Sequence, residues 1–493
     1  MSWEEQLIRL YDKNRSQVGI IQYKSFIKNG KEERIPYVLL PLFHTTVTAQ
    51  IQVTLSAEGE FLGASKVEME DKLTIIPITE KSGSRTGKVP PPHPLCDYLK
   101  YLAGDYGTYV KDSKGDVESF HELYMEELEK WHRSPFSHEK VDAIWSYLKK
   151  GVLIQDLLAE KVLQQKEDGY LGEEVKIEGV SQNMAFVRFI VRGKNGMNFS
   201  QDWHSVTSVE GKKELDYLTG EMQTASYLHS KKIRNEGDGA KLISSNDESY
   251  YTFRGRFTTK EQAFSIGSET SQKMHNALKW IIRKQGRSFD TLTMVTWESD
   301  LKDMPSWDVD TETISSAAVS ETTPEEREDD FSSQFQDDIP EGWGDEENET
   351  SLSDGNPMTA RQFYSALEGY RKQVENTSRM ILMAFDAATT GRLSLAEYKT
   401  LETERYLDNI QKWHEQCGWL QWKYKEGHRK GYFGVPGVRD IADILYGLES
   451  NGRLTIVDKN GKKLYAQLGR RLLPCIWNNR NIPYDLVMTA VNR

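Results

Sequence analysis

The chain has 493 residues, 38% of them hydrophobic, which is enough for about three domains with sizeable cores. Its three cysteines are too few, and too odd a number, for a framework of disulfide bonds, so we expect a reducing compartment, the cytoplasm. No basic start followed by an apolar run opens the sequence, and no apolar stretch reaches the roughly 18 residues of a transmembrane helix. We therefore expect neither a signal peptide nor a membrane partner.

The net charge of −12 is unfavourable for a protein that binds nucleic acid, but the charge is concentrated in one segment. Residues 298–356 contain 20 acidic and two basic residues, so this segment alone carries −18 and the rest of the chain carries +6. With little apolar periodicity, the segment cannot bury enough surface to offset its ordering entropy. We predict an acidic linker or insertion over 298–357, between an N-terminal region (1–297) and a C-terminal region (358–493).

The N-terminal region shows the patterns of both strands and helices. Residues 47–55 alternate strictly between apolar and polar, which predicts a half-buried strand that turns at 56–60 into a second apolar run. Further strands are expected at 73–78 and 184–191. Residues 79–94, with two glycines and three consecutive prolines, predict a loop.

Two apolar stripes at helical spacing predict helices in the same region. One stripe comprises Val141, Ile144, Trp145 and Leu148, behind an expected N-cap at Ser137. The other comprises Met274, Ala277, Leu278, Ile281 and Ile282. On its opposite side Lys279, Arg283 and Arg287 lie four residues apart, and a solvated helix face explains these bases better than a contact with DNA.

The C-terminal region is expected to be mostly helical. Apolar residues from Tyr406 to Tyr424 recur at steps of four and three, which predicts one long helix, and Pro436 begins another. Residues 458–461 predict a hairpin turn, and 484–493 predict the first turns of a final helix with Leu486, Val487 and Ala490 on one side. The fold class is therefore α+β, with antiparallel strands and helices in the N-terminal region.

Catalytic motifs are missing from the sequence. There is no P-loop, no G-x-S-x-G elbow, no H-E-x-x-H and no paired C-x-x-C. Residues 386–397 resemble a calcium-binding loop, but Ala388 and Thr390 replace oxygen ligands, and a helix that ends at Gly391 explains the same residues. His414 and Cys417 are at most half of a zinc site. We expect no enzyme, cofactor or metal; a cryptic metal-dependent nuclease, whose acids meet only in space, stays open as an alternative.

Two loops carry the chemistry of nucleic-acid contacts. Bases, hydroxyls and exposed amides bind phosphates and base edges, and aromatic rings stack on unpaired bases. Composition alone favours solvated surface loops, and Glu236 and Asp238 weaken the second loop as a DNA contact. The candidate DNA-binding residues are Lys81, Ser82, Arg85 and Lys88 in loop 79–94, Lys231, Lys232, Arg234 and Lys241 in loop 229–241, and Asn246, Arg254 and Arg256 after it.

Short motifs follow one another along nearly the whole chain, apart from the acidic segment. They are Leu10-Tyr11-Asp12, His93-Pro94-Leu95-Cys96-Asp97, Ala103-Gly104-Asp105, Gly239-Ala240 with Leu242-Ile243-Ser244, Gly391-Arg392-Leu393-Ser394, Trp413-His414, Arg439-Asp440-Ile441, Leu472-Leu473-Pro474-Cys475-Ile476, and Ile482-Pro483 with Asp485-Leu486-Val487. In this order they resemble the large subunit of the type I-C CRISPR surveillance complex, Cascade.

The resemblance implies a function and a set of partners. It implies a non-catalytic subunit at the crRNA 5′ end that recognises the protospacer-adjacent motif in target double-stranded DNA, helps to open the duplex and recruits a nuclease-helicase. The implied protein partners are the backbone and crRNA-processing subunits and a small helical subunit. In this family a helical bundle continues beyond the motif at Asp485, and we expect the chain to lack it. A scaffold that binds only protein partners is the second alternative.

Overall fold

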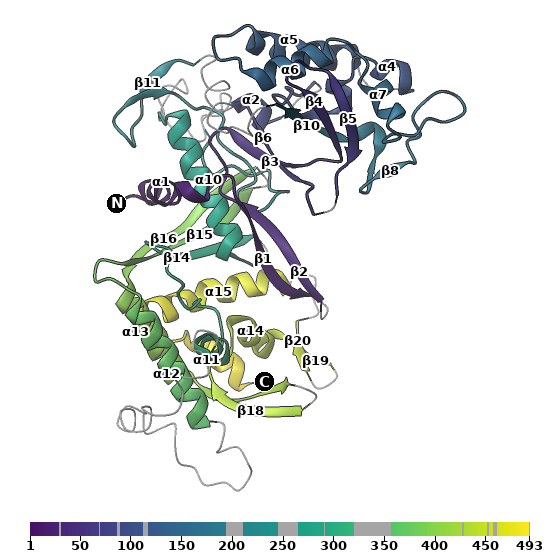
Figure 1. Cartoon of the computed structure of the whole chain (residues 1–493). Helices are drawn as coiled ribbons and strands as arrows, with labels where there is room; N and C mark the ends of the chain where they lie inside the picture. The colour runs from purple at the N-terminus through teal and green to yellow at the C-terminus, as the bar shows by residue number, and fades with distance from the viewer. Residues whose placement is uncertain are drawn as a thin grey trace, which may run out of the picture. The chain divides into compact units, whose positions relative to one another are not determined.

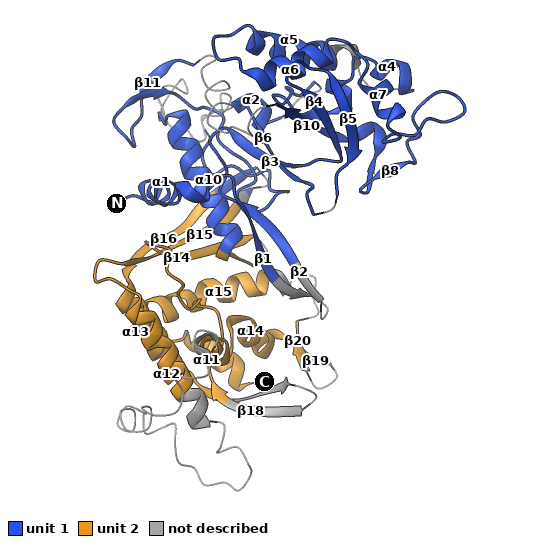
Figure 2. Cartoon of the chain, in the orientation of Figure 1, with its two compact units in different colours: residues 1–284, 389–393 blue, residues 285–388, 394–493 orange. Residues whose placement is uncertain are grey.

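A computed structural model describes residues 1–28, 31–68, 70–85, 89–111, 117–193, 211–244, 265–289, 291–319, 356–389, 391–425, 428–450, 453–456 and 461–492. The chain forms two compact units, coloured separately in Figure 2. Unit 1 comprises residues 1–284 and 389–393, and unit 2 comprises 285–388 and 394–493. Helices and strands occur in both units, which confirms the predicted α+β class (Figure 1).

Unit 1 is built around a four-stranded sheet in the order β5-β4-β10-β7. Strand β10 runs parallel to β4 and antiparallel to β7, and helices α6 and α7 pack on the sheet (Figure 1). The elements of unit 1 are α1 (Trp3–Lys13), η1 (Arg15–Gln17), β1 (Ile21–Lys28), β2 (Lys31–Val38), β3 (His44–Thr48), β4 (Ile51–Ser56), β5 (Phe61–Lys66), β6 (Leu73–Pro77), α2 (Glu80–Gly83), β7 (Asp97–Tyr98), α3 (Leu99–Leu102), α4 (Tyr106–Tyr109), α5 (Val117–His132), α6 (Glu139–Leu148), α7 (Leu153–Ala159), β8 (Lys176–Ile177), β9 (Val180–Ser181), η2 (Gln182–Met184), β10 (Phe186–Arg192), β11 (Lys213–Leu215), β12 (Met222–Thr224) and α10 (Ser268–Gln285).

The strand predicted over 47–55 has the expected faces but is two strands. Ala49, Ile51, Val53 and Leu55 are fully buried, which confirms the alternation. However, β3 pairs with β6, whereas β4 pairs with β5 and β10. The partners change at Gln50, whose N–H donates to the Phe186 carbonyl (3.0 Å) and whose side-chain oxygen accepts from the Phe186 N–H (2.7 Å). The periodicity therefore predicted which side chains are buried and did not predict the change of partner.

The two predicted helices of unit 1 are present as α6 and α10. The N-cap of α6 is His138 rather than Ser137, whose hydroxyl instead donates to Asp142 (2.7 Å). In α10 the whole predicted apolar stripe is buried. The basic side of α10, however, is no solvated face, because Lys279 is half-buried and the Arg283 side chain is only 17% exposed.

Unit 2 combines a second four-stranded sheet, β13-β14-β15-β16, with helices. Its core includes residues of β14 and β15 together with α12, α13 and α15. The elements are β13 (Arg287–Phe289), β14 (Leu292–Glu298), α11 (Thr311–Val319), α12 (Asn356–Lys372), β15 (Arg379–Thr389), β16 (Arg392–Glu402), α13 (Thr403–Gln416), β17 (Trp419–Lys425), β18 (His428–Gly434), α14 (Val438–Tyr446), β19 (Leu448–Ser450), β20 (Arg453–Thr455), α15 (Gly461–Asn478) and α16 (Tyr484–Val491).

Three local predictions for the C-terminal region were wrong. The stripe from Tyr406 is not one helix, because α13 ends at Gln416, and after Gly418 the chain forms β17, which pairs with β18. Gly461 begins α15 instead of closing a hairpin; the hairpin is formed earlier, by β19 and β20. The segment 386–397 belongs to the neighbouring strands β15 and β16 and not to two helices.

The end of the described chain is helical as predicted. Helix α16 buries Leu486, but Val487 and Ala490, which were expected on the same side, are exposed. The exposed side also includes Tyr484 and Val491, which are 76% and 72% exposed. No helix among the described residues is both long and apolar enough to span a membrane.

The beginning of the segment expected to be an acidic linker is folded. The Glu298 carboxylate is buried and accepts from the backbone N–H groups of Asp300 (2.7 Å) and Lys302 (3.1 Å). Trp307 and Ile314 belong to the core of unit 2. The charge count could not reveal these few apolar anchors; residues 320–355 lie outside the described residues, so the role of the acidic segment stays a prediction.

The turn between β4 and β5 gives a test of how closely it packs on α6. Gly59 has φ +82°, and a Cβ there would lie 2.6 Å from the Ala143 carbonyl oxygen. Gly220 has φ +74° and open space around it. We predict that Gly220→Ala lowers the free energy of unfolding by about 1–2 kcal/mol, the cost of placing alanine at a positive φ. Gly59→Ala should lower it clearly more, because the added Cβ also collides with α6. Urea unfolding of both variants measures the difference, and equal midpoints would show that the turn does not pack as described.

Candidate nucleic-acid interface

The first candidate loop begins with one helical turn. Helix α2 carries a capping box, in which the Ser82 N–H donates to Thr79 Oγ1 (3.1 Å) and the Thr79 N–H donates to Ser82 Oγ (3.0 Å). Ser82 is 1% exposed, so its hydroxyl serves the cap, whereas Lys81 is exposed on the outside of the turn. Lys81 is thus the described side chain of this turn that is free to approach a ligand.

Arg85 braces the rest of the first loop. Its guanidinium forms an ion pair with the fully buried carboxylate of Asp97, and its Nε donates to the Pro91 carbonyl (2.8 Å). The Asp97 carboxylate also accepts from the backbone N–H groups of His93 (2.7 Å) and Tyr98 (2.8 Å). Burial raises the pKa of Asp97, and the Arg85 charge opposes this shift. Arg85 therefore holds the loop together, and its place as a DNA contact stays a prediction.

The second candidate loop is held by its own acidic residues. Arg234 and Asp238 form a two-pronged pair, with Nε–Oδ2 at 2.8 Å and Nη2–Oδ1 at 3.0 Å, and both side chains are largely buried. The Lys232 ammonium (Nζ) lies 3.5 Å from the Glu236 carboxylate (Oε2). The carboxylates that weakened this loop as a DNA contact in the sequence are therefore the groups that fold it.

The structure brings the two candidate loops together. The Lys231 ammonium donates to the Ser84 carbonyl (3.1 Å), and Ser226 hydrogen-bonds the Glu80 carboxylate at the start of α2. Burial, with the charge of Lys231, lowers the pKa of Lys241, and Glu80 opposes that shift. Segments about 150 residues apart in sequence thus form one basic patch, which we define as Lys81, Lys231, Lys232 and Lys241.

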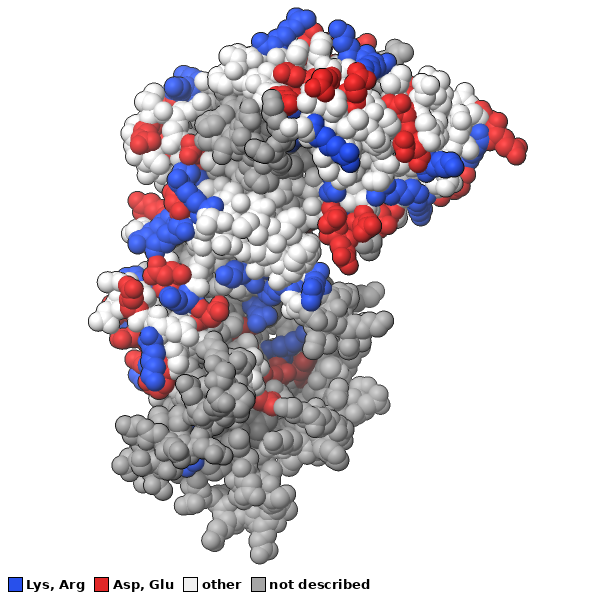
Figure 3. All heavy atoms as spheres, viewed as in Figure 1, with Lys and Arg blue, Asp and Glu red and all other residues white. Residues whose placement is uncertain are grey.

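The charges of the described residues on the face seen in Figure 3 do not form a general positive field. On the face of the molecule in Figure 3, described Lys and Arg side chains are interleaved with Asp and Glu. Lys88, Asn246, Arg254 and Arg256, which were also predicted to contact DNA, lie outside the described residues. Lys279 and Arg283 of α10 are neighbours of loop 229–241, which their spacing as a basic side of the helix did not predict.

The candidate metal ligands are used in other ways. His414 is buried and hydrogen-bonds the Thr311 hydroxyl through Nδ1 (2.8 Å), and burial lowers its pKa to about 3. The Asp386 carboxylate forms an ion pair with Arg470. Within the described ranges, no group of three His, Cys, Asp or Glu residues is placed to hold a metal ion.

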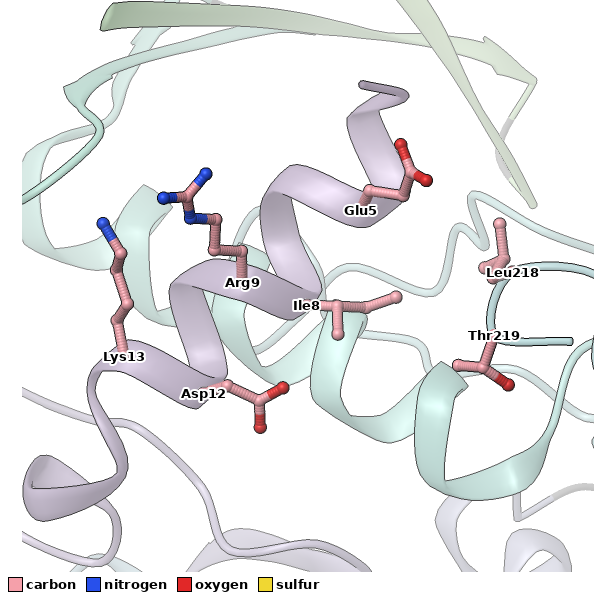
Figure 4. Close-up of a pocket in the computed structure, with 7 residues that line it drawn as sticks. All are labelled: Glu5, Ile8, Arg9, Asp12, Lys13, Leu218 and Thr219. Carbon is pink, nitrogen blue, oxygen red and sulfur yellow. The ribbon is translucent and has the colours of Figure 1, made fainter. Parts of the chain in front are cut away.

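An open groove of about 480 Å³ lies beside α1, and none of the candidate residues above lines it (Figure 4). Ile8 points from α1 toward Leu218 and Thr219, and the charged side chains of α1 form the rim (Figure 4). Acids and bases alternate on this rim, so it offers no net charge to a nucleic acid.

A comparison with protein families agrees with the order of the motifs. The family model described as CRISPR-associated protein (Cas_Csd1) matches residues 21–493, nearly the whole chain. Among curated proteins, none matches the chain. The family match confirms the resemblance to the large subunit of a type I-C Cascade.

The brace between Arg85 and Asp97 leads to a stability prediction. We predict that Arg85→Ala lowers the free energy of unfolding by about 3–5 kcal/mol, because it leaves a buried carboxylate without its charge partner. The loss should shrink as the pH is lowered, because the unpaired carboxylate is then protonated in the folded state. Lys81→Ala is the control and should change stability by less than about 0.5 kcal/mol. Urea unfolding at two pH values measures both; equal stability of the two variants would contradict the brace.

Proposed function

Because the chain belongs to the Csd1 family of CRISPR-associated proteins, we propose that it is a non-catalytic large subunit of an RNA-guided antiviral complex. We infer that it recognises the protospacer-adjacent motif in target duplex DNA and helps to recruit a nuclease-helicase. In such complexes the guide RNA pairs with most of the target, and the protein reads only a short duplex motif. A small surface with few base contacts is sufficient for that task.

The observation that carries this proposal is the meeting of the two candidate loops. The hydrogen bond from Lys231 to the Ser84 carbonyl joins them, and Lys81 and Lys232 are exposed beside this junction. Lysines at such a junction supply phosphate contacts, which position the protein on the duplex, and the loop backbones offer groups for base edges. The ion pairs of Arg85 and Arg234 keep both loops in shape before DNA arrives, so less ordering entropy opposes binding.

The proposed partners follow from membership of the family. They are the crRNA 5′ end, the backbone and crRNA-processing subunits, the small helical subunit and the nuclease-helicase, all in the cytoplasm. The exposed apolar side of α16, with Tyr484 and Val491, offers a surface for one of the protein partners. No cofactor is part of the proposal.

The basic patch can be tested by removing two exposed charges. We predict that Lys81→Gln/Lys232→Gln weakens duplex binding by the complex reconstituted with guide RNA and the other subunits. If each lysine contacts one phosphate, the slope of log K against log salt should fall by about 1.8 in magnitude. Titration of a labelled target duplex at several salt concentrations measures the slope.

A matched control removes two lysines from other parts of unit 1. Lys130→Gln/Lys176→Gln deletes the same charge from α5 and β8, and it should leave the slope unchanged. An equal loss in both double variants would show a non-specific charge effect. If binding also proves equal with and without this chain in the complex, the subunit is a scaffold and the proposal fails.

The non-catalytic role gives a separate prediction. The chain, incubated with Mg²⁺ or Mn²⁺, should leave single- and double-stranded DNA intact, because the described residues hold no ligand cluster for a metal nuclease. Gel electrophoresis of labelled DNA measures this. Metal-dependent cleavage that follows the chain through purification would favour the nuclease alternative.

A further inference from the structure

The basic side of α10 is covered by loop 229–241, the loop that supplies three of the four lysines of the basic patch. Arg283 Nη2 donates to Glu236 Oε1 (2.7 Å) and to the Lys232 carbonyl (3.1 Å), and Arg283 Nη1 donates to the Lys279 carbonyl (3.2 Å). Lys279 is one turn before Arg283 on the same side of the helix and is half-buried. Its ammonium is thus held next to two cations, Arg283 and Lys232.

The cluster of Lys279, Arg283, Lys232 and Glu236 contains fewer acidic than basic side chains. Glu236 is shared by Arg283 (2.7 Å) and Lys232 (3.5 Å), whereas the Lys279 ammonium makes no hydrogen bond or ion pair with any residue that the structure describes. Three cations therefore surround one carboxylate.

The other titratable groups nearby do not correct the imbalance. His275 lies one turn before Lys279 on α10 and feels the charges of Lys279 and Lys241. Its ring stacks against His229 of the loop at 5.8 Å, and burial lowers the pKa of both imidazoles, His275 to about 4 and His229 to about 3. Both rings are thus neutral near pH 7 and bring no negative charge.

A desolvated ammonium without a partner is unfavourable in the free protein. Burial first, and then the charges of Arg283 and Lys232, lower the pKa of Lys279 to about 7, and the charge of Glu236 only partly opposes this shift. An anionic ligand would offset the effect of burial and that of the Arg283 charge, because it supplies a negative charge and hydrogen-bond acceptors. Lys and Arg side chains bind the phosphate oxygens of nucleic acids through charge-assisted hydrogen bonds.

We propose that Lys279, beside Arg283 and Lys232, binds a phosphate group of the target DNA backbone, whose charge replaces the carboxylate that the cluster lacks. The inference rests on the proposed function and deepens it, because it adds α10 to the two loops as a third element of the DNA surface. Its ligand is a phosphodiester, so it positions the duplex and reads no base.

The proposal couples DNA binding to a proton. Above about pH 7 the Lys279 amine is neutral in the free protein, and it must take up a proton when the phosphate binds. Binding is then favoured at low pH and weakens as the pH rises, until Lys279 contributes nothing. A contact that stays charged throughout would give no pH dependence of this kind.

Three forms of the complex test the coupling: wild type, Lys279→Met and Lys279→Arg. Their duplex affinity is measured from about pH 6.5 to about pH 9, with melting temperature as the check on folding. At the lowest pH, Lys279→Met should bind about tenfold more weakly than wild type, and the two should converge at the highest pH. Lys279→Arg keeps its charge, so it should bind as wild type at low pH and hold its affinity at high pH.

A lysine of the same helix that already has partners serves as the control. Lys273 pairs with Asp12 (3.4 Å) and Glu269 (3.1 Å), so Lys273→Met should retain the pH dependence of wild type. If wild type and Lys279→Met bind equally at every pH, or differ by a constant factor, the inference is wrong while the proposed function stands. If no form binds duplex DNA, the proposed function itself fails. Should Lys279→Arg not fold, the comparison of wild type with Lys279→Met still decides.

Discussion

The buried carboxylate of Asp97 is the constraint on which the candidate surface depends. A fully buried carboxylate is unfavourable unless a cation and several hydrogen bonds compensate it, and here Arg85 and two backbone N–H groups do so. The same residue pairs with Val187 across β7 and β10. A single polar group therefore ties the proline-rich segment to the sheet and sets where α2 presents Lys81.

The cations around this site divide into two groups by what they already bind. Arg85 and Arg234 have dedicated carboxylates and give the loops their shape. Lys241 and Lys279 are half-buried without such partners, and burial lowers the pKa of each. Counting basic residues along the sequence could not separate these groups, because the separation depends on which acid lies within reach. In this protein, the useful indication of a candidate anion-binding surface is a local excess of basic side chains over the acidic side chains within their reach.

Sequence periodicity predicted much of the local structure and little of what depends on distant partners. The buried residues of 47–55 and of α10 followed from alternation and from the helical stripe. The exchange of partners at Gln50 depends on Phe186, and the folding of 298–319 depends on Trp307 and Ile314 reaching a core built by later helices. The apolar stripe from Tyr406 extended past Gly418 because residues four apart share a face in a strand as well as in a helix. For the site, both loops were predicted, but their junction through Lys231 and Ser84 and the position of Lys279 require the fold.

The five residues 389–393 have a consequence for how the chain can fold. They belong to unit 1, where the backbone of Lys241 donates to the Gly391 carbonyl (3.1 Å) and accepts from the Leu393 N–H (2.9 Å). Unit 1 is therefore not a continuous stretch of chain, and a growing polypeptide that has reached residue 284 still lacks a piece of it. During synthesis the ribosome must first produce more than a hundred further residues, so for that interval the loop bearing Lys241 is left with unpaired backbone groups. The candidate DNA surface is thus complete only after residues 389–393 have been translated, although most of β15 and β16, the strands on either side of them, belongs to unit 2.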